Sequence, residues 1–327
     1  MPASRLPLPT TVLGGTGLQV TRLGFGAWAI GGGGYDFAWG STDDDESLGA
    51  IERALEAGVN WIDTAPAYGL GHSEELVGRA IAGRPDRPYV FTKASILDGG
   101  GGTFAHSLKR DSILREAEAS LGRLGLDAID LYQIHWPNPE PDIEEGWGAF
   151  AELKEQGLVR HIGVCNFSVE QLRRISQVAP VETLQPPYSL ADRRAETGLL
   201  AFAASEGLGV LAYSPMCSGL LTGAMTRERL AGLPDDDWRK HGTQFVEPAL
   251  TRNLELVERL RWVADARSVS LGAVAVAWAL RHPAVDAAIV GFRRPSQVDP
   301  ILPAASLELS DAELAAISAG RKVADES

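Results

Sequence analysis

Short apolar runs rich in β-branched residues alternate with longer amphipathic stretches along most of the chain. This alternation is typical of the βαβ units that build a parallel sheet. Eight runs are predicted to form strands: Arg22–Ala27, Asn60–Ile62, Tyr89–Ala94, Ile129–His135, Arg160–Cys165, Glu182–Gln185, Gly209–Tyr213 and Ala287–Val290. The amphipathic stretches predict helices at Asp43–Ala57, Ser73–Ile81, Arg110–Leu124, Ile143–Glu155, Val169–Val178, Thr197–Ser205, Arg252–Ala266 and Leu271–Arg281.

Two architectures accommodate this pattern. Eight βα units with right-handed crossovers close into a (β/α)8 barrel. An open doubly wound sheet would instead need a glycine-rich phosphate turn after its first strand. Gly31–Gly34 lies near that point, but it lacks the G-x-G-x-x-G spacing and is not followed at once by a helix. We therefore predict an α/β fold of the TIM-barrel type. The hairpin predicted at Thr11–Val20 should plug the bottom of the barrel, and long loops should stand at its C-terminal face.

Length and composition indicate one globular unit. Single α/β barrels reach 327 residues, so residues 1–327 are expected to form one domain. No stretch approaches the roughly 20 consecutive apolar residues of a membrane helix, and residues 1–10 lack the apolar core of a secretory signal. The two cysteines are isolated, so neither a disulfide framework nor a metal site is predicted, and the protein is expected to be cytoplasmic.

The net charge of −13 argues against a nucleic acid or an anionic membrane as partner, because no overall positive field would attract either. A phosphate-bearing ligand is compatible with this charge, but it would need a local basic pocket. The sequence leaves open whether the protein is a monomer or a homo-oligomer.

Function in a barrel resides at the C-terminal ends of the strands. Polar residues just after predicted strands are Asp63, Lys93, His135 and Asn166, and Tyr68 follows Asp63 by five residues. Each has a structural alternative: the aspartate could brace a turn, the histidine could be a satisfied core residue, and the tyrosine could simply pack. Lys93 is harder to explain in this way, because it lies within an apolar strand where burial without a partner is costly. Such a cluster often marks an active site.

Seven segments of the chain form a recognisable set. The longest is GVNWIDTAPAYGLGHSEELVGRAI (Gly58–Ile81). The others are the Lys93 strand, LYQIHWP (Leu131–Pro137), IGVCNFS (Ile162–Ser168), LQPPYSL (Leu184–Leu190), YSPMCSGLLTG (Tyr213–Gly223) and IVGFRRPSQV (Ile289–Val298). Together they resemble the aldo-keto reductases, in particular bacterial members of the branch that is similar to general stress proteins and potassium-channel β-subunits. The segments occur in order and with family-like spacing, from about Val12 to the C-terminal helix.

The resemblance implies reversible, NADPH-dependent reduction of a carbonyl compound. The implied catalytic residues are Asp63, Tyr68, Lys93 and His135: Tyr68 as general acid, Lys93 held by Asp63 beside it, and His135 orienting the carbonyl oxygen. The implied cofactor residues are Gly26, Ala27, Trp28, Asp63, Cys165, Asn166, Gln185, Tyr213, Ser214, Met216, Gly219, Leu220, Gly291, Arg293 and Gln297. The substrate should contact Trp28, Trp39, Tyr68, His135 and Trp136.

Within this set, Asn166 and Gln185 are expected to hold the nicotinamide carboxamide and Tyr213 to stack on its ring. Arg293, beside a helix predicted to begin at Pro295, is expected to clamp the 2′-phosphate. The neighbouring Arg294 is an alternative for this contact.

The chain departs from the family pattern at three places. Cys165 replaces a serine, and Ala224–Met225 replaces a Gly-Lys-Tyr type of continuation. Pro300–Ile301 stands where close relatives carry Glu-Asn facing the adenosine, and Pro300 should break the preceding helix.

Two other functions remain open at this point: an NADPH-binding sensor with little turnover, and a Schiff-base aldolase acting through Lys93. The glycine-rich segment Asp98–Thr103 is predicted to be a mobile loop tip, and Trp238 is expected to fold over the cofactor.

Overall fold

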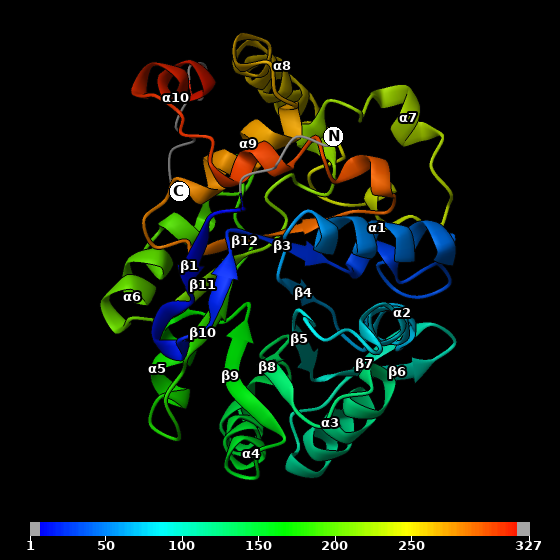
Figure 1. Ribbon diagram of the computed structural model, residues 1–327, viewed down its shortest axis with the longest axis vertical. Coiled ribbons are helices and arrows are strands. Elements are labelled where there is room, and N and C mark those ends of the chain that lie inside the picture. The colour runs from blue at the N-terminus through cyan, green and yellow to red at the C-terminus, as the bar shows by residue number, and fades with distance from the viewer. Residues whose placement is uncertain (1–6, 319–327) are drawn as a thin grey trace.

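The predicted barrel is confirmed by the computed structural model, which describes residues 7–318 of the chain. Eight parallel strands close on one another in sequence order, and the helices lie around them (Figure 1). The strands are β3 (Leu23–Gly26), β4 (Trp61–Asp63), β5 (Tyr89–Ala94), β8 (Ile129–Ile134), β9 (Val159–Cys165), β10 (Thr183–Gln185), β11 (Gly209–Ala212) and β12 (Ala287–Gly291). All the predicted strand positions are correct to within two residues.

The helices begin where side chains can cap them. Asp43 accepts a hydrogen bond from the Glu46 backbone at the start of α1, and Ser168 forms a capping box with Gln171 at the start of α5. The helices are α1 (Asp44–Glu56), α2 (His72–Ile81), α3 (Arg110–Leu124), α4 (Ile143–Glu155), α5 (Val169–Ile175), α6 (Leu199–Glu206), α7 (Arg227–Ala231), α8 (Ala249–Arg267), α9 (Leu271–Leu280) and α10 (Asp311–Ser318). Helix α9 is apolar on all sides, and each of its residues from Gly272 to Leu280 is buried.

The N-terminal hairpin consists of β1 (Thr10–Val12) and β2 (Gln19–Thr21), joined by the 3₁₀ turn Gly14–Thr16. Leu13 and Val20 are fully buried against Trp61, Phe91 and other residues at one end of the barrel. A Cβ added to Gly14 would lie 2.2 Å from the Gly209 backbone nitrogen at the start of β11. The hairpin therefore closes the N-terminal end of the barrel, as predicted.

The segment Asp98–Thr103, predicted to be a mobile loop tip, contains strand residues as well as the turn at 101–102. This segment belongs to a second hairpin, formed by β6 (Ile96–Gly100) and β7 (Thr103–His106). The Asp36 backbone nitrogen donates to Gly102 O at 2.8 Å, and the Phe104 nitrogen donates to the Asp36 carboxylate at 3.1 Å. Contacts with a segment about 65 residues earlier in the chain thus order a glycine run whose local sequence predicts a loop.

A helical turn begins at Pro295, as predicted, but it is a short 3₁₀ turn and not an α-helix. Only the 3₁₀ turns Pro295–Gln297 and Leu302–Ala305 form there. Pro300 and Pro303 lack backbone donors, which excludes a continuous α-helix, as the sequence indicated for Pro300.

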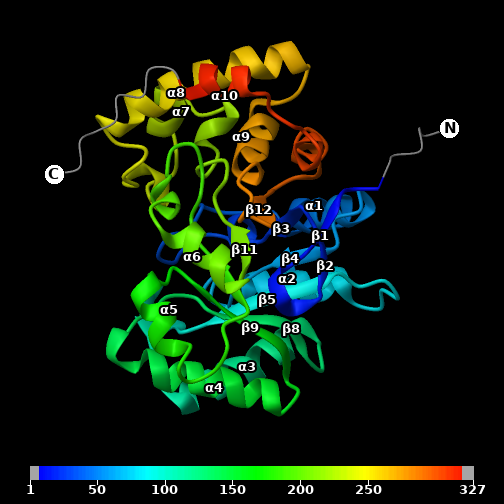
Figure 2. The ribbon, with the colours of Figure 1, turned by 90° about the vertical axis from the view of Figure 1, so that its left-hand side faces the viewer.

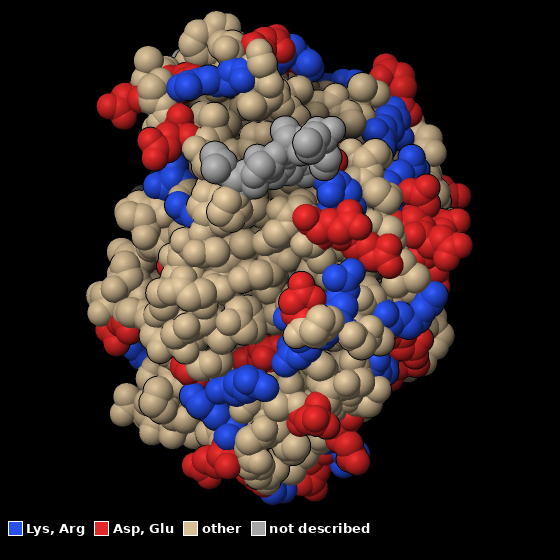
Figure 3. Space-filling model, in the orientation of Figure 1, with Lys and Arg blue, Asp and Glu red and all other residues tan. Residues whose placement is uncertain are grey.

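The C-terminal helices α8 and α10 lie together at one end of the molecule (Figure 2), where Arg267 of α8 is paired with Glu313 of α10. Among residues 7–318 no single helix is long and apolar enough to span a membrane, although the sharply bent pair α8 and α9 would pass by length and composition alone. On the face shown in Figure 3, acidic and basic side chains are interspersed rather than gathered by sign.

Candidate active site

Three of the predicted catalytic residues stand at the ends of three adjacent strands. Asp63 is the last residue of β4, Lys93 is the penultimate residue of β5, and His135 follows β8. The strand register places Lys93 opposite Gln133 of β8. Because parallel strands end at the same face of a barrel, residues far apart in sequence meet at one point.

A buried ion pair lies at the centre of this group. Lys93 is fully buried, and its Nζ donates to Asp63 Oδ1 at 2.5 Å and to Thr64 O at 2.9 Å. Burial by itself lowers the pKa of the Lys93 ammonium, but the charge of Asp63 and its hydrogen bond, together with Tyr68 and Cys165, outweigh this effect, and the pKa is raised above its usual value. Lys93 therefore stays charged at neutral pH, and its charge is held at one position.

Tyr68 lies directly beside this charge. Lys93 Nζ is 5.0 Å from the centroid of the Tyr68 ring, and the ring stands edge-on to His135 at 5.6 Å between centroids. Burial raises the pKa of the Tyr68 phenol, and the positive charge of Lys93 acts in the opposite direction. The phenol keeps its proton at neutral pH and faces a cation that would stabilise its conjugate base.

His135 is a neutral imidazole at physiological pH. Burial lowers its pKa well below the usual value, and the charge of Lys93 and the neighbouring His106 act in the same direction. A neutral imidazole next to a phenol offers one donor and one acceptor nitrogen to a polar ligand.

The two predicted amide residues are connected to this group. Asn166 donates from Nδ2 to His135 O at 2.9 Å and accepts from the Tyr213 hydroxyl at 2.8 Å. Gln185 Nε2 donates to Asp63 Oδ2 at 2.9 Å and lies 3.2 Å from Gln133 Oε1. Both amides thus line the mouth of the barrel next to Asp63 and His135.

Sequence reasoning missed Gln133, which is fully buried within β8 and donates to Asp63 Oδ2 at 3.4 Å. The signal was a polar amide inside the apolar run IDLYQI. Cys165 lies on its other side, with Sγ 3.8 Å from Gln133 Oε1, and burial raises the pKa of the Cys165 thiol. This thiol is therefore a neutral, weak donor rather than a nucleophile.

The loop after β11 has an unusual backbone. Ser214, Cys217, Ser218 and Gly219 all have positive φ. Turns of this kind point successive N–H groups into a concave surface that accepts anions. Of the other predicted residues in this loop, Met216 has its Sδ near Gly272, and Leu220 is fully buried.

Arg293 lies beside a cavity whose lining contains both arginines and acidic residues. Its guanidinium donates to Trp39 O at 3.3 Å and to Ser41 O at 2.8 Å. Burial lowers its pKa, and Arg239, Arg294 and Arg229 are close enough to act in the same direction. A polar cavity of about 420 Å³ adjoins it, lined by Ser41, Thr42, Asp43, Glu46, Arg293 and Arg294.

The other predicted cofactor residues occupy the ends of neighbouring strands. Gly26 of β3 pairs with Gly291 of β12, and Ala27 follows β3 directly. Gln297 Oε1 accepts from the Arg293 backbone nitrogen at 2.7 Å, so this side chain fixes the turn that carries Arg293.

An aromatic cluster covers one side of Tyr68. Trp28 stacks on Trp238 at 5.4 Å and meets Trp39 edge-on at 5.2 Å, and it lies 6.3 Å from the Tyr68 ring. The long loop between β11 and α8 therefore does fold back over the barrel mouth at Trp238. By contrast, Trp136 is 45% exposed.

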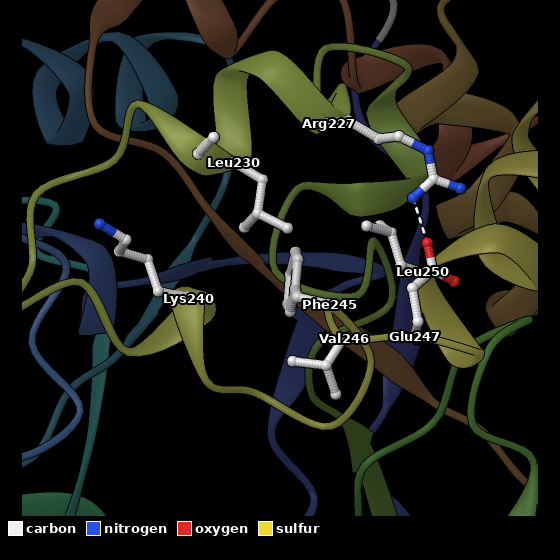
Figure 4. Close-up of a pocket in the computed structure, with 8 residues that line it drawn as sticks. Arg227, Leu230, Lys240, Phe245, Val246, Glu247 and Leu250 are labelled. Carbon is white, nitrogen blue, oxygen red and sulfur yellow. Dashed lines mark hydrogen bonds and ion pairs between the residues drawn. The ribbon is translucent and has the colours of Figure 1, made fainter.

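Figure 4 shows a separate apolar hollow. Leu230, Phe245 and Leu250 point toward one another there, and an ion pair between Arg227 and Glu247 stands at the side. Phe245 meets Trp238 edge-on, so the hollow and the aromatic cluster share a wall.

No group of three or more His, Cys, Asp and Glu side chains able to hold a metal ion is found within residues 7–318. The donor set at the barrel mouth consists instead of amides, hydroxyls, backbone N–H groups and arginines. Such a set fits an organic ligand with phosphate groups.

Comparison with known proteins agrees with this geometry. Residues 22–321 match the model of the Aldo/keto reductase family. The chain is 42% identical over 292 residues to Aldo-keto reductase YhdN of Bacillus subtilis (strain 168), a match that covers 88% of this chain and 86% of that protein. It is 33% identical over 315 residues to the NADH-specific methylglyoxal reductase of Escherichia coli (strain K12), which covers 92% and 94% of the two chains. The solved structure of the glycerol dehydrogenase AKR11B4 from Gluconobacter oxydans matches with a TM-score of 0.84 at 38% identity, over 94% of each chain.

Proposed function

Because the chain belongs to the aldo/keto reductase family, we propose that it reduces an aldehyde or ketone to the alcohol, reversibly, with NADPH as cofactor and Tyr68 as general acid. The observation that carries the proposal is the buried Lys93–Asp63 pair, whose ammonium lies 5.0 Å from the Tyr68 ring. An ion pair with a purely structural role does not need a phenol beside it. A phenol that donates a proton, by contrast, is assisted by a positive charge next to it.

The cofactor would be held by the residues around this pair. When bound, its nicotinamide supplies the hydride. Asn166 and Gln185 would hold the carboxamide, Tyr213 would support the ring, and the positive-φ turn at Ser214–Gly219 would bind the pyrophosphate. Arg293 would meet the 2′-phosphate in the polar cavity beside it.

The side chains of the protein stabilise the negative charge that develops on the carbonyl oxygen. His135, kept neutral by burial, donates a hydrogen bond that orients this oxygen. Tyr68 then gives its proton to the oxygen as negative charge builds up there. Lys93 stabilises the resulting phenolate, and Asp63 keeps Lys93 in place. In the direction of alcohol oxidation the same groups act in reverse.

NADPH is proposed over NADH because of the arginines near Arg293. The same cavity also contains Asp43 and Glu46, which would accept from a ribose hydroxyl and oppose a phosphate. One relative is named as NADH-specific. The proposal of NADPH means that Arg293, rather than this acidic pair, faces the 2′-position.

The two other functions are less well supported. An aldolase needs a neutral nucleophilic amine, but the pKa of Lys93 is raised and its ammonium is paired with Asp63. An NADPH-binding sensor would have the same site as a reductase and would differ from it only in a low turnover rate. Sustained turnover would therefore exclude this function. We propose small-molecule substrates and a cytoplasmic location.

The test is a steady-state screen of NADPH and NADH oxidation over small aldehydes and ketones, with Tyr68→Phe as the matched variant. This change deletes only the transferable proton, so kcat should fall by about 10²–10⁴-fold. Quenching of protein fluorescence by the cofactor should stay normal. An unchanged kcat in the variant would show that Tyr68 is not the acid.

A further inference from the structure

The β6–β7 hairpin carries a second histidine to the barrel mouth. His106, the last residue of β7, pairs with Ile96 of β6 in the antiparallel register. Cross-strand partners project from the same face of a two-stranded sheet. Ile96 belongs to the small apolar cluster that packs with Ala65, Ala67 and Tyr68. The His106 ring therefore lies on the side of the hairpin that faces the Tyr68 loop.

Two further observations place His106 at the site rather than on a remote surface. It is close enough to His135 to contribute to the lowered pKa of that residue. Its Nδ1 is buried and has no hydrogen-bond partner among residues 7–318. Buried polar side-chain atoms normally have a partner. A substrate atom that reaches this nitrogen would supply one.

We propose that His106 binds a second oxygen of the substrate, on the carbon next to the reacting carbonyl. This assignment rests on the proposed function, in which Tyr68 and His135 hold the carbonyl oxygen. Oxygen atoms on neighbouring carbons are close enough for two histidines on adjacent segments to bind them together. The substrate class is therefore a small carbonyl compound with a hydroxyl or second carbonyl at the adjacent carbon.

The aromatic side chains near His106 increase the selectivity for a substrate with a second oxygen. Phe104 lies two residues earlier on the same strand and stacks on Phe37 at 6.3 Å. Tyr35 lies against the same Phe104 ring at 6.1 Å. In such surroundings the His106 imidazole is a polar group that can meet a second oxygen. Sites that hydrogen-bond a substrate hydroxyl discriminate strongly against analogues that lack it.

The experiment compares 2-hydroxypropanal with 2-methylpropanal, which replaces the hydroxyl by a methyl group of similar size. With whichever cofactor is active, the wild type should prefer 2-hydroxypropanal by about ten-fold or more in kcat/KM. His106→Leu should remove this preference and change kcat/KM for 2-methylpropanal by less than about three-fold. His106→Asn keeps a polar atom near the position of Nδ1 and should retain part of the preference.

Phe104→Leu serves as the control on the same face of the hairpin and should affect both aldehydes alike. If His106→Leu slows both aldehydes equally, His106 is structural and the assignment is overturned. Turnover of both aldehydes without any preference in the wild type overturns the assignment alone, as does turnover of other carbonyl compounds but of neither aldehyde. No turnover of any compound in the wider carbonyl screen overturns the proposed function as well. If the leucine variant does not fold, His106→Asn and His106→Gln decide by the same ratio.

Discussion

At the scale of single residues, the charged groups of the barrel mouth depend on one another. Lys93 and Asp63 are both buried, and the distance of 2.5 Å between them places the ammonium beside the Tyr68 ring. Gln133 and Gln185 donate to the second oxygen of Asp63. Removing one partner of a buried pair leaves the other charge uncompensated. The pair therefore acts as one positioned cation and not as two separate side chains.

The role proposed for Arg293 predicts how its substitution would change the choice of cofactor. Arg293→Ala should raise the KM for NADPH by about one to two decades and leave the KM for NADH nearly unchanged, because a charge-assisted contact is worth roughly 1.5–3 kcal/mol. Steady-state kinetics with both cofactors measures this, and Arg294→Ala is the control in the same cavity. Arg293 also holds the backbone at Trp39 and Ser41. An equal rise in both KM values would therefore assign it to loop anchoring.

At the scale of elements, the β6–β7 hairpin matters because it docks on the loop after β3. Asp36 links the loop to the hairpin by hydrogen bonds of both its backbone nitrogen and its carboxylate. Phe104 of the hairpin contacts the Phe37 and Tyr35 rings of this loop. The same loop carries Trp39, which belongs to the aromatic cluster above Tyr68. The docking thus shapes the entrance to the site.

A substitution at Gly102 tests whether the docking of the hairpin on this loop matters. A Cβ at Gly102 would lie 2.4 Å from Gly34 O, whereas one at Gly101 would meet no atom of residues 7–318 within 4 Å. Both glycines have positive φ, so an alanine at either position bears the same kind of backbone strain. Gly102→Ala should therefore be less stable than Gly101→Ala by about 1–3 kcal/mol and should raise the KM for aldehyde further. Denaturant unfolding and kinetics measure both effects. Equal behaviour of the two variants would show that the contact with Gly34 does not matter.

At the scale of the whole molecule, a buried carboxyl group links stability to pH. Glu116 of α3 accepts from the Ser95 backbone nitrogen at 2.9 Å and from Ser112 Oγ at 3.1 Å. Burial raises its pKa from 4.5 to about 7. Between these values the unfolded chain has released the proton and the folded protein still binds it. This residue therefore costs stability as the pH rises from about 4.5 to 7.

Glu116→Gln removes the titrating proton and keeps the size of the side chain. We compare the unfolding free energy of Glu116→Gln with that of the wild type at each pH. Relative to the wild type, the variant should be more stable at pH 8 than at pH 5 by roughly 2–3 kcal/mol. Chemical denaturation at the two pH values measures the change. Glu118→Gln is the control, since Glu118 lies on the same helix and is exposed. If the difference for Glu116→Gln is the same at both pH values, this carboxyl group does not titrate in the expected range.

The sequence by itself determined the order and positions of the eight barrel strands, because they are short apolar runs separated by longer stretches, most of which form helices. It also placed Asp63, Lys93 and His135 at one face, because parallel strands in a barrel end together. These features depend on local patterning and on a topological rule. Neither requires knowledge of which loops touch.

Tertiary structure decided the features that depend on contacts between distant segments. The β6–β7 hairpin forms from a glycine run because Asp36 binds it, and no residue within the run indicates this. His106 reaches the barrel mouth only through that hairpin. The segment after Arg293 makes 3₁₀ turns, so a single turn, and no α-helix dipole, stands beside the arginines. Trp238 meets Trp28 by folding of a loop whose path has no periodic sequence signal. Periodicity fixes elements, whereas loop docking depends on long-range contacts that the local sequence does not encode.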